Sequence, residues 1–308
     1  MTKIFVHEPK EDWIVDRIVR EFRHGASEHV TDDPSRAKIV WVPAGWCADQ
    51  VRSLRRASSA KFVISVHHIV AAKPEQAAHI IACDDVADAY HVPCDITRSA
   101  LASLTDKPIF VLPYWVNDTI WHPITPEERQ AIRKSLGLSP TTTVIGSFQR
   151  DTEGSDNVSP KLEKGPDLLC DYVERRASTE DVTVLLAGYR RAYVTDRLRR
   201  SGVKFSLFER APLGAMRWLY GALDLYVVSS RCEGGPQALL ECAACKVPVI
   251  SRDVGLARSV LAARSVNDDL VLASPDEREA YERVQRLRAQ VLIPQYVKAL
   301  VAIGESTS

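Results

Sequence analysis

Short apolar segments alternate with amphipathic segments along most of the chain. The apolar segments are rich in valine and isoleucine, which is typical of strands buried on both faces, whereas the amphipathic segments repeat apolar positions at helical spacing. The pattern predicts strands at residues 3–6, 37–43, 61–66, 79–82, 108–112, 143–148, 182–187, 203–208, 225–228 and 247–250. It predicts helices at residues 12–23, 47–57, 97–104, 127–136, 165–176, 192–200, 216–223, 236–245, 275–290 and 295–303. This alternation indicates an α/β protein with parallel sheets, whose ligands bind beyond the carboxyl ends of the strands.

The alternation stops once and then restarts, which divides the chain into two parts. Pro123 and Pro126 indicate a stiff linker at the interruption. A chain of 308 residues is long enough for two domains of roughly 150 residues each. We therefore expect a first domain at residues 1–122 and a second domain at residues 123–294.

The composition is that of an ordinary soluble globular protein, with 45% hydrophobic and 26% charged residues. The 40 basic and 40 acidic residues balance, so the charge does not favour a nucleic acid or a strongly anionic surface as a partner. No apolar run approaches the roughly 20 residues that a membrane span requires, and the chain enters its first predicted strand without a secretory signal pattern. These features predict a cytoplasmic protein without a transmembrane segment.

The seven cysteines do not follow a disulfide or zinc pattern. Cys242 and Cys245 make one Cys-x-x-Cys pair, but the pair lies inside an apolar predicted helix and has no histidine partners at zinc spacing. Buried free thiols pack like small hydrophobic side chains. The sequence therefore predicts free core cysteines in a reducing compartment and no metal site.

The most informative segment is residues 225–251, for which the pattern predicts a strand, a glycine turn, a helix and a second strand. Gly234 and Gly235 allow the turn, and Pro236 suits the first helical position. The first amides of a helix are unpaired and lie at the positive end of its dipole, so they bind anions such as a diphosphate. The expected donors are Gly234, Gly235 and Gln237, because Pro236 has no N–H group.

Glu241 lies on the same predicted helix, whose other positions are almost all apolar. A carboxylate on a helix that is buried nearly all round needs partners. Ligand hydroxyl groups would serve, because helical side chains lean towards the N-terminus and so towards the turn that carries Glu233. The alternative is that Glu241 reaches solvent from a helix end.

Residues 230–250 resemble the Glu-x7-Glu signature of retaining glycosyltransferases of the GT-B fold, in the large family numbered 4. The resemblance implies two Rossmann-like, doubly wound domains facing a central cleft, with the nucleotide sugar held mainly by the second. It also implies that Glu233 lies beside the donor sugar and that Glu241 holds the ribose of the nucleotide. The family usually has a glycine where this chain has Lys246. That departure affects the end of the helix and not the ligand.

A basic loop before residue 165 is the expected second part of the donor site. The family has an arginine followed by a lysine-glycine pair, whose positive charges neutralise the leaving diphosphate, and the resemblance assigns these roles to Arg150 and Lys164. Their spacing is longer than is usual in the family, so Lys161 is an alternative to Arg150, and any of these cations could be a solvated surface charge. We include Arg210 among the donor-binding residues. Preplaced cations stabilise a departing diphosphate more than the bound donor, so no metal is expected.

The first domain carries fewer chemical signals. His67 ends a predicted strand, where the ligands of parallel sheets bind, although a histidine there can also be purely structural. The resemblance implies a histidine of the first domain against the donor sugar, and both His67 and His68 are candidates. His7, Glu8 and Trp13 follow the first strand, and we expect them on the acceptor side together with His68.

The activity that the resemblance implies is sugar transfer, with retention at the anomeric carbon, from a UDP- or GDP-linked donor to a hydroxyl group of a carbohydrate or small-molecule acceptor. In the front-face mechanism proposed for the family, the leaving phosphate takes the acceptor proton, and no cofactor is needed beyond the donor. The family's last helix, residues 295–308 here, braces the first domain. Two alternatives are a sugar-nucleotide epimerase or hydrolase of the same fold and a non-catalytic nucleotide-sugar-binding protein. The sugar, the base, the acceptor and the oligomeric state stay open.

Overall fold

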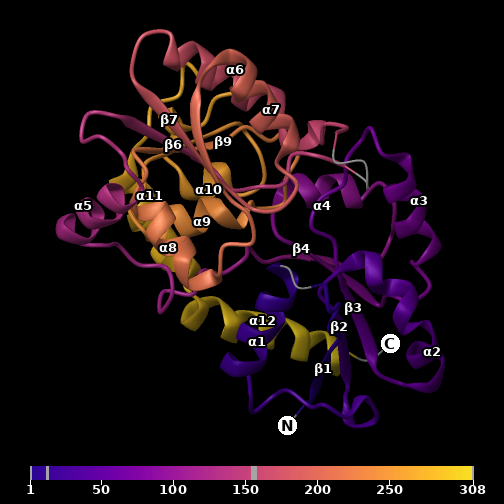
Figure 1. Ribbon diagram of the computed structural model, residues 1–308. Helices are drawn as coiled ribbons and strands as arrows, with labels where there is room; N and C mark the ends of the chain where they lie inside the picture. The colour runs from indigo at the N-terminus through magenta and orange to yellow at the C-terminus, as the bar shows by residue number, and fades with distance from the viewer. Residues whose placement is uncertain (1, 12–13, 154–157, 307–308) are drawn as a thin grey trace. The chain divides into compact units, whose positions relative to one another are not determined.

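The computed structural model describes residues 2–11, 14–153 and 158–306. The chain divides into two compact units, named here unit 1 (Met1–Asn117 and Arg286–Ser308) and unit 2 (Asp118–Gln285). Most of unit 1 is indigo to purple in Figure 1, and unit 2 runs from magenta to orange. The chain passes between the units at 117/118 and at 285/286, which is five and nine residues before the boundaries that we expected from the sequence. Within the described ranges, no helix is both long and apolar enough to cross a membrane.

Unit 1 is built on a parallel sheet of five strands in the order β1-β2-β3-β4-β5. The strands are β1 (Ile4–Val6), β2 (Ile39–Val42), β3 (Lys61–Ser65), β4 (Ala89–Val92) and β5 (Ile109–Val111). The helical segments are α1 (Ile14–Gly25), η1 (Pro34–Arg36), η2 (Gly45–Val51), α2 (Arg52–Ala57), α3 (Pro74–Ala82), α4 (Asp95–Leu101) and α12 (Ala289–Glu305). Ile4 also forms an isolated parallel bridge with Val30. Because that bridge lies on the side of β1 opposite β2, the strand order reverses at β1.

The prediction of a strand at residues 79–82 is wrong, because these residues end helix α3. Pro74 starts this helix at a position where a missing N–H costs nothing. A short apolar run such as this one cannot be assigned to helix or strand by periodicity alone. The strand that occupies this place in the sheet is β4, which the pattern missed because the polar His91 interrupts it.

A buried polar network joins α12 to the sheet of unit 1. The indole N–H of Trp41 donates to Ser65 Oγ at 2.9 Å, and Ser65 Oγ lies 2.9 Å from His91 Nδ1. His91 Nε2 lies 2.9 Å from the carbonyl oxygen of Leu112 and 3.0 Å from the hydroxyl group of Tyr296, a residue of α12. Burial lowers the pKa of His91 to about 4, so the imidazole is neutral near pH 7.

Unit 2 contains a second five-stranded parallel sheet, in the order β10-β9-β6-β7-β8. The strands are β6 (Thr143–Ser147), β7 (Val182–Ala187), β8 (Lys204–Phe208), β9 (Leu225–Val228) and β10 (Val249–Ser251). The α-helices are α5 (Pro126–Ser135), α6 (Pro166–Ala177), α7 (Ala192–Ser201), α8 (Leu213–Gly221), α9 (Gln237–Ala244), α10 (Ala257–Val260) and α11 (Glu277–Val284). Three 3-10 segments are η3 (Leu162–Lys164), η4 (Ala263–Ser265) and η5 (Gln285–Leu287), the last at the boundary with unit 1. All five strands lie close to their predicted ranges.

The strand order of unit 2 reverses at β6. From β6 the chain continues to β7 and β8 on one side of the sheet and later to β9 and β10 on the other. The connections that leave the carboxyl ends of β6 and β9 therefore diverge, and ligands of doubly wound sheets bind at such a reversal. This topology directs attention to the loop after β6 and to the turn after β9.

Candidate active site

Gly165 brings the loop that follows β6 against the end of β9. Its φ is 60°, and a Cβ atom at this position would lie 2.0 Å from the carbonyl oxygen of Ser229. Only glycine combines this left-handed backbone with so close an approach. The hydroxyl groups of Ser229 and Ser230 lie 3.3 and 3.4 Å from the carbonyl oxygen of Lys164. The sequence Lys164-Gly165 therefore fixes the lysine beside the residues that lead into the turn after β9.

Lys164 and Glu233 form an ion pair at this reversal point, with 2.7 Å between Nζ and Oε1. Ser230 Oγ donates to the same carboxylate oxygen at 3.0 Å, and Gln149 Nε2 donates to the carbonyl oxygen of Lys164 at 2.8 Å. The side chains of the pair are only 14% and 9% exposed. The structure thus brings together two charged residues that the sequence assigned to the diphosphate and the sugar.

Glu241 is buried in an aromatic environment, with 6% of its surface exposed. The hydroxyl group of Tyr220 donates to Glu241 Oε2 at 2.8 Å, and the rings of Phe148 and Trp121 lie 4.9 and 5.5 Å from that of Tyr220. The alternative that Glu241 reaches solvent is therefore wrong. The carboxylate has a protein partner as well, because Tyr220 supplies one. Burial and the charge of Glu241 raise the pKa of Tyr220 well above its usual value, so the phenol stays a donor.

The glycine turn is held from the side of β10. Gly255 has φ 51°, and a Cβ atom there would lie 2.2 Å from the carbonyl oxygen of Gly235. The same carbonyl accepts a hydrogen bond from the N–H of Leu256 at 2.8 Å. Helix α9 begins at Gln237, and Pro236 is its extended N-cap and not its first helical residue. The amide donors that we expect at this turn stay a prediction.

The backbone at Lys246 explains the glycine that is usual in the family at this position. Lys246 follows the end of α9 with φ 55°, in the left-handed region that glycine adopts most readily after a helix. Its ammonium group lies 4.5 Å from the centroid of the Tyr281 ring, in α11. The substitution is therefore accommodated by a contact outside the site.

A buried ion pair anchors the start of the loop after β6. Arg191 Nε lies 3.0 Å from Asp151 Oδ2, and the two side chains are 0% and 1% exposed. Arg191 Nη1 also donates to the carbonyl oxygen of Ser147, the last residue of β6, at 2.6 Å. The neighbouring Arg150 is exposed at the surface, and the pKa of its guanidinium is lowered by desolvation and by the charge of Arg190. Arg150 is thus a cation on a firmly attached segment.

The other two cations that the sequence proposed for the donor have different surroundings. Lys161 Nζ lies 3.4 Å from Glu163 Oε1. The guanidinium of Arg210 lies 5.3 Å from the centroid of the Tyr189 ring. Arg210 follows β8, which is separated from β6 by β7, and the structure does not group it with the ion pair of Lys164.

In unit 1, His67 lies between two aromatic rings at the carboxyl end of β3. Its Nδ1 is hydrogen-bonded to the hydroxyl group of Tyr114, and its ring centroid is 5.5 Å from that of Trp46. His68 is the next residue and is partly buried. The backbone carbonyl of His67 accepts a hydrogen bond from Thr97 Oγ1 at 3.1 Å. His67 is thus held by α4 as well as by the aromatic rings.

The remaining residues expected on the acceptor side have protein partners. His7 Nε2 lies 3.0 Å from Gln50 Oε1, and Glu8 forms an ion pair with Arg23 at 3.1 Å. Trp13 lies outside the described residues. The structure therefore places His7 and Glu8 after β1, near the strand reversal of unit 1, and their contact with an acceptor stays a prediction.

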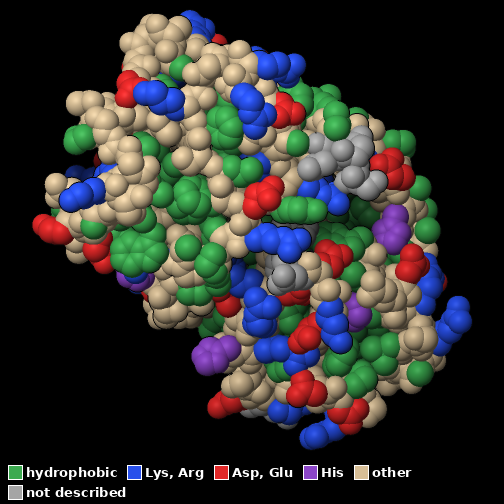
Figure 2. Space-filling model, in the orientation of Figure 1, with side chains coloured by type: hydrophobic (Ala, Val, Ile, Leu, Met, Phe, Trp, Pro, Cys, Tyr) green, Lys and Arg blue, Asp and Glu red, His purple; other side chains and the backbone are tan. Residues whose placement is uncertain are grey.

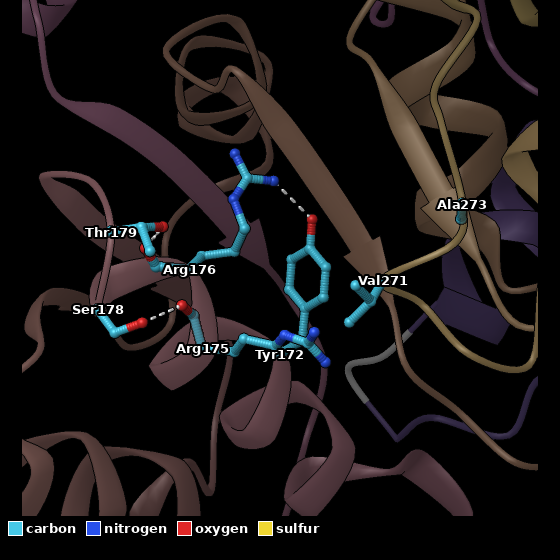
Figure 3. Close-up of a pocket in the computed structure, with 7 residues that line it drawn as sticks. All are labelled: Tyr172, Arg175, Arg176, Ser178, Thr179, Val271 and Ala273. Carbon is cyan, nitrogen blue, oxygen red and sulfur yellow. Dashed lines mark hydrogen bonds between the residues drawn. The ribbon is translucent and has the colours of Figure 1, made fainter.

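Unit 2 also contains a cavity of about 280 Å³ at the amino ends of its strands. Figure 3 shows its lining residues, with Arg176 donating to the hydroxyl group of Tyr172 at 2.8 Å. The lining residues are Tyr172, Arg175, Arg176, Ser178, Thr179, Val271 and Ala273. Helix α6 begins beside Lys164 and ends at this cavity, so the cavity and the ion pair lie at opposite ends of the helix.

Residues 157–290 match the family model described as glycosyl transferases group 1. Two curated relatives are each 26% identical to the chain. An alpha-galactosylglucosyldiacylglycerol synthase of Streptococcus pneumoniae aligns over 55% of this chain and 44% of its own length. The lipopolysaccharide core biosynthesis mannosyltransferase LpsB of Rhizobium meliloti aligns over 58% and 50%. The chain thus spans about half the length of these relatives.

Similarity to solved structures extends over both units. The match to the crystal structure of Anabaena HepE in complex with UDP and glucose covers 98% of this chain and 100% of the HepE chain, with a TM-score of 0.81 at 11% identity. Together with two parallel sheets flanked by helices, this match decides the architecture. The fold is GT-B. The segment that matches the family model contains Lys164, Glu233 and Glu241.

Sequence reasoning missed three residues that shape the site in unit 2. Ser230 lies within the recognised motif, and its position three residues before Glu233 could have indicated a local hydrogen bond. Gln149 begins the basic loop, but nothing in the sequence indicates that its amide reaches Lys164. Tyr220 is 21 residues from Glu241, and only the packing of α8 against α9 brings them together.

Proposed function

We propose that this chain is a retaining glycosyltransferase that moves a sugar from a nucleoside-diphosphate sugar to an acceptor hydroxyl group without a metal ion. The observation that carries the proposal is the ion pair of Lys164 and Glu233 at the strand reversal of unit 2. A cation and a carboxylate are held there at hydrogen-bond distance beside the start of α9. This arrangement offers one group to a phosphate and the other to a sugar.

The diphosphate of the donor would lie between Lys164 and the first amides of α9. Both present positive charge to it, from the ammonium group and from the helix dipole. Lys164 pairs with the carboxylate of Glu233, so in this arrangement its ammonium group would limit repulsion between that carboxylate and the phosphate. Arg150 on the same loop is the proposed second cation. Charge that develops on the leaving diphosphate is then stabilised by groups already in place.

In the proposed reaction, the bond from the anomeric carbon to the diphosphate oxygen breaks, and the acceptor oxygen bonds to the anomeric carbon on the same face. The proton of the acceptor hydroxyl group passes to the leaving phosphate oxygen. Glu233 would contact the sugar and stabilise the positive charge that develops on it. His67 of unit 1, oriented by Tyr114, is the proposed second contact to the sugar.

The nucleoside would bind through its ribose to Glu241, whose other partner is Tyr220. Structures of HepE hold UDP and UDP-glucose, and this supports testing uridine nucleotides first. The named activities of the two curated relatives support a carbohydrate or glycolipid acceptor. GDP-linked donors remain the other candidates for the test.

Calorimetry with UDP and GDP, followed by product analysis with the matching nucleotide sugars, tests the proposal. We expect one nucleoside diphosphate to bind, slow donor hydrolysis without acceptor, and a product with retained anomeric configuration when a glycan acceptor is added. An isomerised donor would identify an epimerase. Binding without any turnover across the donor and acceptor panel would identify a nucleotide-sugar-binding protein.

Metal independence is tested in the same assay with EDTA. Because Lys164, Arg150 and the helix dipole supply the positive charge, we expect the initial rate to be unchanged by the chelator. Loss of activity that manganese restores would show that a metal ion carries the phosphate charge.

A further inference from the structure

Three side chains with metal-ligand donor atoms lie together in unit 1. Asp49 belongs to η2, His79 to α3, and Cys83 is the C-cap residue of α3. Their donor atoms all lie within 4.8 Å of one another. This group was not identified from the sequence, because residues 79–82 were predicted as a strand. In a helix, His79 and Cys83 are one turn apart and share a face.

The distances within this group are close to those of a tetrahedral metal site. Cys83 Sγ lies 3.5 Å from Asp49 Oδ1, and from His79 it lies 3.7 Å from Nε2 and 3.9 Å from Nδ1. His79 Nδ1 lies 3.7 Å from the other carboxylate oxygen of Asp49, Oδ2. In a zinc site with bonds of about 2.0 to 2.3 Å, tetrahedral geometry separates neighbouring ligand atoms by roughly 3.4 to 3.6 Å. Small side-chain movements therefore suffice to bring all three ligands to bonding distance of one ion.

The imidazole of His79 has the second contact that metal-bound histidines generally make. Its Nε2 lies 3.3 Å from the backbone carbonyl oxygen of Gly45. A proton on Nε2 that is donated to this carbonyl leaves the lone pair of Nδ1 available to an ion. Backbone carbonyl partners of this kind fix the tautomer and orientation of a ligating histidine. Gly45 precedes Asp49 in η2, so one segment supplies both a ligand and this support.

Arg52 occupies part of the surroundings of the group. Its Nε donates to Asp49 Oδ1 at 2.8 Å, and its Nη2 lies 3.7 Å from Cys83 Sγ. Arg52 also contacts both carboxylate oxygens of Asp85, at 2.8 and 2.7 Å, and the carbonyl oxygen of Ala82. It therefore keeps partners of its own when Asp49 turns towards an ion. The side chain of Asp49 is 59% exposed, which provides a path from solvent.

We propose that Asp49, His79 and Cys83 bind a zinc-class divalent transition-metal ion, with a water molecule as the fourth ligand. Thiolate, imidazole and carboxylate are the ligand set that such ions prefer. Binding forms the metal–sulfur bond and releases the thiol proton of Cys83 to solvent. The same η2 segment carries Trp46, which contacts His67, and Gln50, which contacts His7. The ion thus fastens to α3 the segment that lies beside the expected acceptor residues.

Titration of the metal-stripped protein with zinc chloride and with cobalt chloride tests the site. We expect one equivalent of Co²⁺ to give a thiolate charge-transfer band and the visible bands of tetrahedral cobalt, and one equivalent of Zn²⁺ to abolish them. Zinc should also raise the melting temperature, by an amount that grows with the logarithm of its concentration. Asp49→Asn and Cys83→Ser should each weaken zinc binding at least tenfold.

Two matched variants serve as controls. Glu75→Gln removes an exposed carboxylate from the first turn of α3 but keeps all three ligands, so it should bind zinc like the parent protein. Cys232→Ser removes a partly buried thiol elsewhere and should keep the cobalt spectrum. Asp49 lies at the surface, so Asp49→Asn tests the site even if Cys83→Ser does not fold. The proposal is overturned if the parent protein shows no cobalt–thiolate band, or if Asp49→Asn binds zinc as tightly as the parent.

The proposal of a metal-binding site and the proposal of sugar transfer can be tested independently of each other. Zinc binding is measured without donor or acceptor, so its loss says nothing against sugar transfer. Assaying Asp49→Asn with and without EDTA separates the effect of this ion in unit 1 from a metal requirement at the diphosphate.

Discussion

The carboxyl ends of the two parallel sheets carry different chemistry. In unit 2 this edge presents a buried ion pair, Lys164 and Glu233, with Arg150 on the same loop. In unit 1 it presents His67 between the rings of Tyr114 and Trp46. A diphosphate needs fixed positive charge, whereas a sugar or another largely neutral group is well matched by polar aromatic surfaces. Two sheets of similar topology thus present different side chains at the same edge.

On the face shown in Figure 2, basic and acidic side chains are interspersed and do not form one large patch of a single sign. The positive charge proposed for the donor belongs to two residues of the loop after β6, Arg150 and Lys164. Variants in that loop should separate it from the rest of the molecule.

Lys164→Ala is the most severe test of the charged edge. It removes the proposed phosphate cation and leaves Glu233 without its ion-pair partner, so nucleoside-diphosphate affinity and turnover should both fall, with kcat/KM reduced on the order of 10³-fold. Steady-state kinetics and calorimetry measure the two effects. Lys161→Ala is the matched control, because Lys161 is a lysine of the same loop that pairs with Glu163. An equal loss of affinity and kcat/KM in the control would show that Lys164 has no special role in phosphate binding.

Glu233→Ala should separate chemistry from nucleotide binding. If Glu233 contacts the sugar only, turnover should fall by about 10² to 10³, while nucleoside-diphosphate affinity stays near that of the parent. Single-turnover kinetics at saturating donor and calorimetry with the nucleoside diphosphate give the two quantities. The opposite result, weak nucleotide binding with unchanged turnover, would mean that the roles of Glu233 and Glu241 are exchanged.

Acid should destabilise unit 1 through His91. Its pKa is about 4 in the folded protein and 6.5 in the reference state, so the unfolded chain binds more protons between these values. The stabilising contribution is complete above pH 6.5 and is lost as the pH falls towards 4, by about 3 kcal/mol in total. The free energy of opening of strand β4, obtained from hydrogen exchange corrected for the intrinsic exchange rate at each pH, should fall over this range more than that of β7. An equal fall in His91→Gln would assign the effect to other groups.

Glu241→Gln should have the smallest effect among these tests. The amide keeps the shape and can still accept a hydrogen bond from Tyr220, so only the charged contact to the ribose is lost. Nucleotide affinity should weaken by roughly 1 to 3 kcal/mol, as expected for one hydrogen bond to a charged group. Unchanged affinity in a folded variant would exclude Glu241 as the ribose ligand. Tyr220→Phe is a control that removes the protein partner and keeps the carboxylate.

The contrast between the units also explains how much the sequence could predict. The strands of unit 2 are short apolar runs next to clear turn residues. The site is marked by Gly165, which follows Lys164 and lies where only glycine fits. In unit 1, His91 is polar by type but buried within a strand, and residues 79–82 are apolar but helical. In both cases the secondary structure depends on tertiary contacts, which the local sequence pattern does not reveal.

The site itself divides in the same way. Lys164, Glu233 and Glu241 could be found from their neighbours in the chain. Tyr220 and Gln149 could not, because each meets its partner only through packing between elements distant in sequence. The group of Asp49, His79 and Cys83 was not predicted for a related reason. Because residues 79–82 were predicted as a strand, the spacing of one helical turn between His79 and Cys83 was not recognised.

The contact between His91 and Tyr296 sets an order of events during synthesis. The two residues are separated by 205 positions, and all of unit 2 lies between them. At a translation rate of roughly 5 to 20 residues per second, the ribosome adds Tyr296 about 10 to 40 s after His91. Until then the sheet of unit 1 lacks its last helix, while unit 2, being continuous, can fold as soon as it emerges. The first unit to be started is therefore the last to be completed.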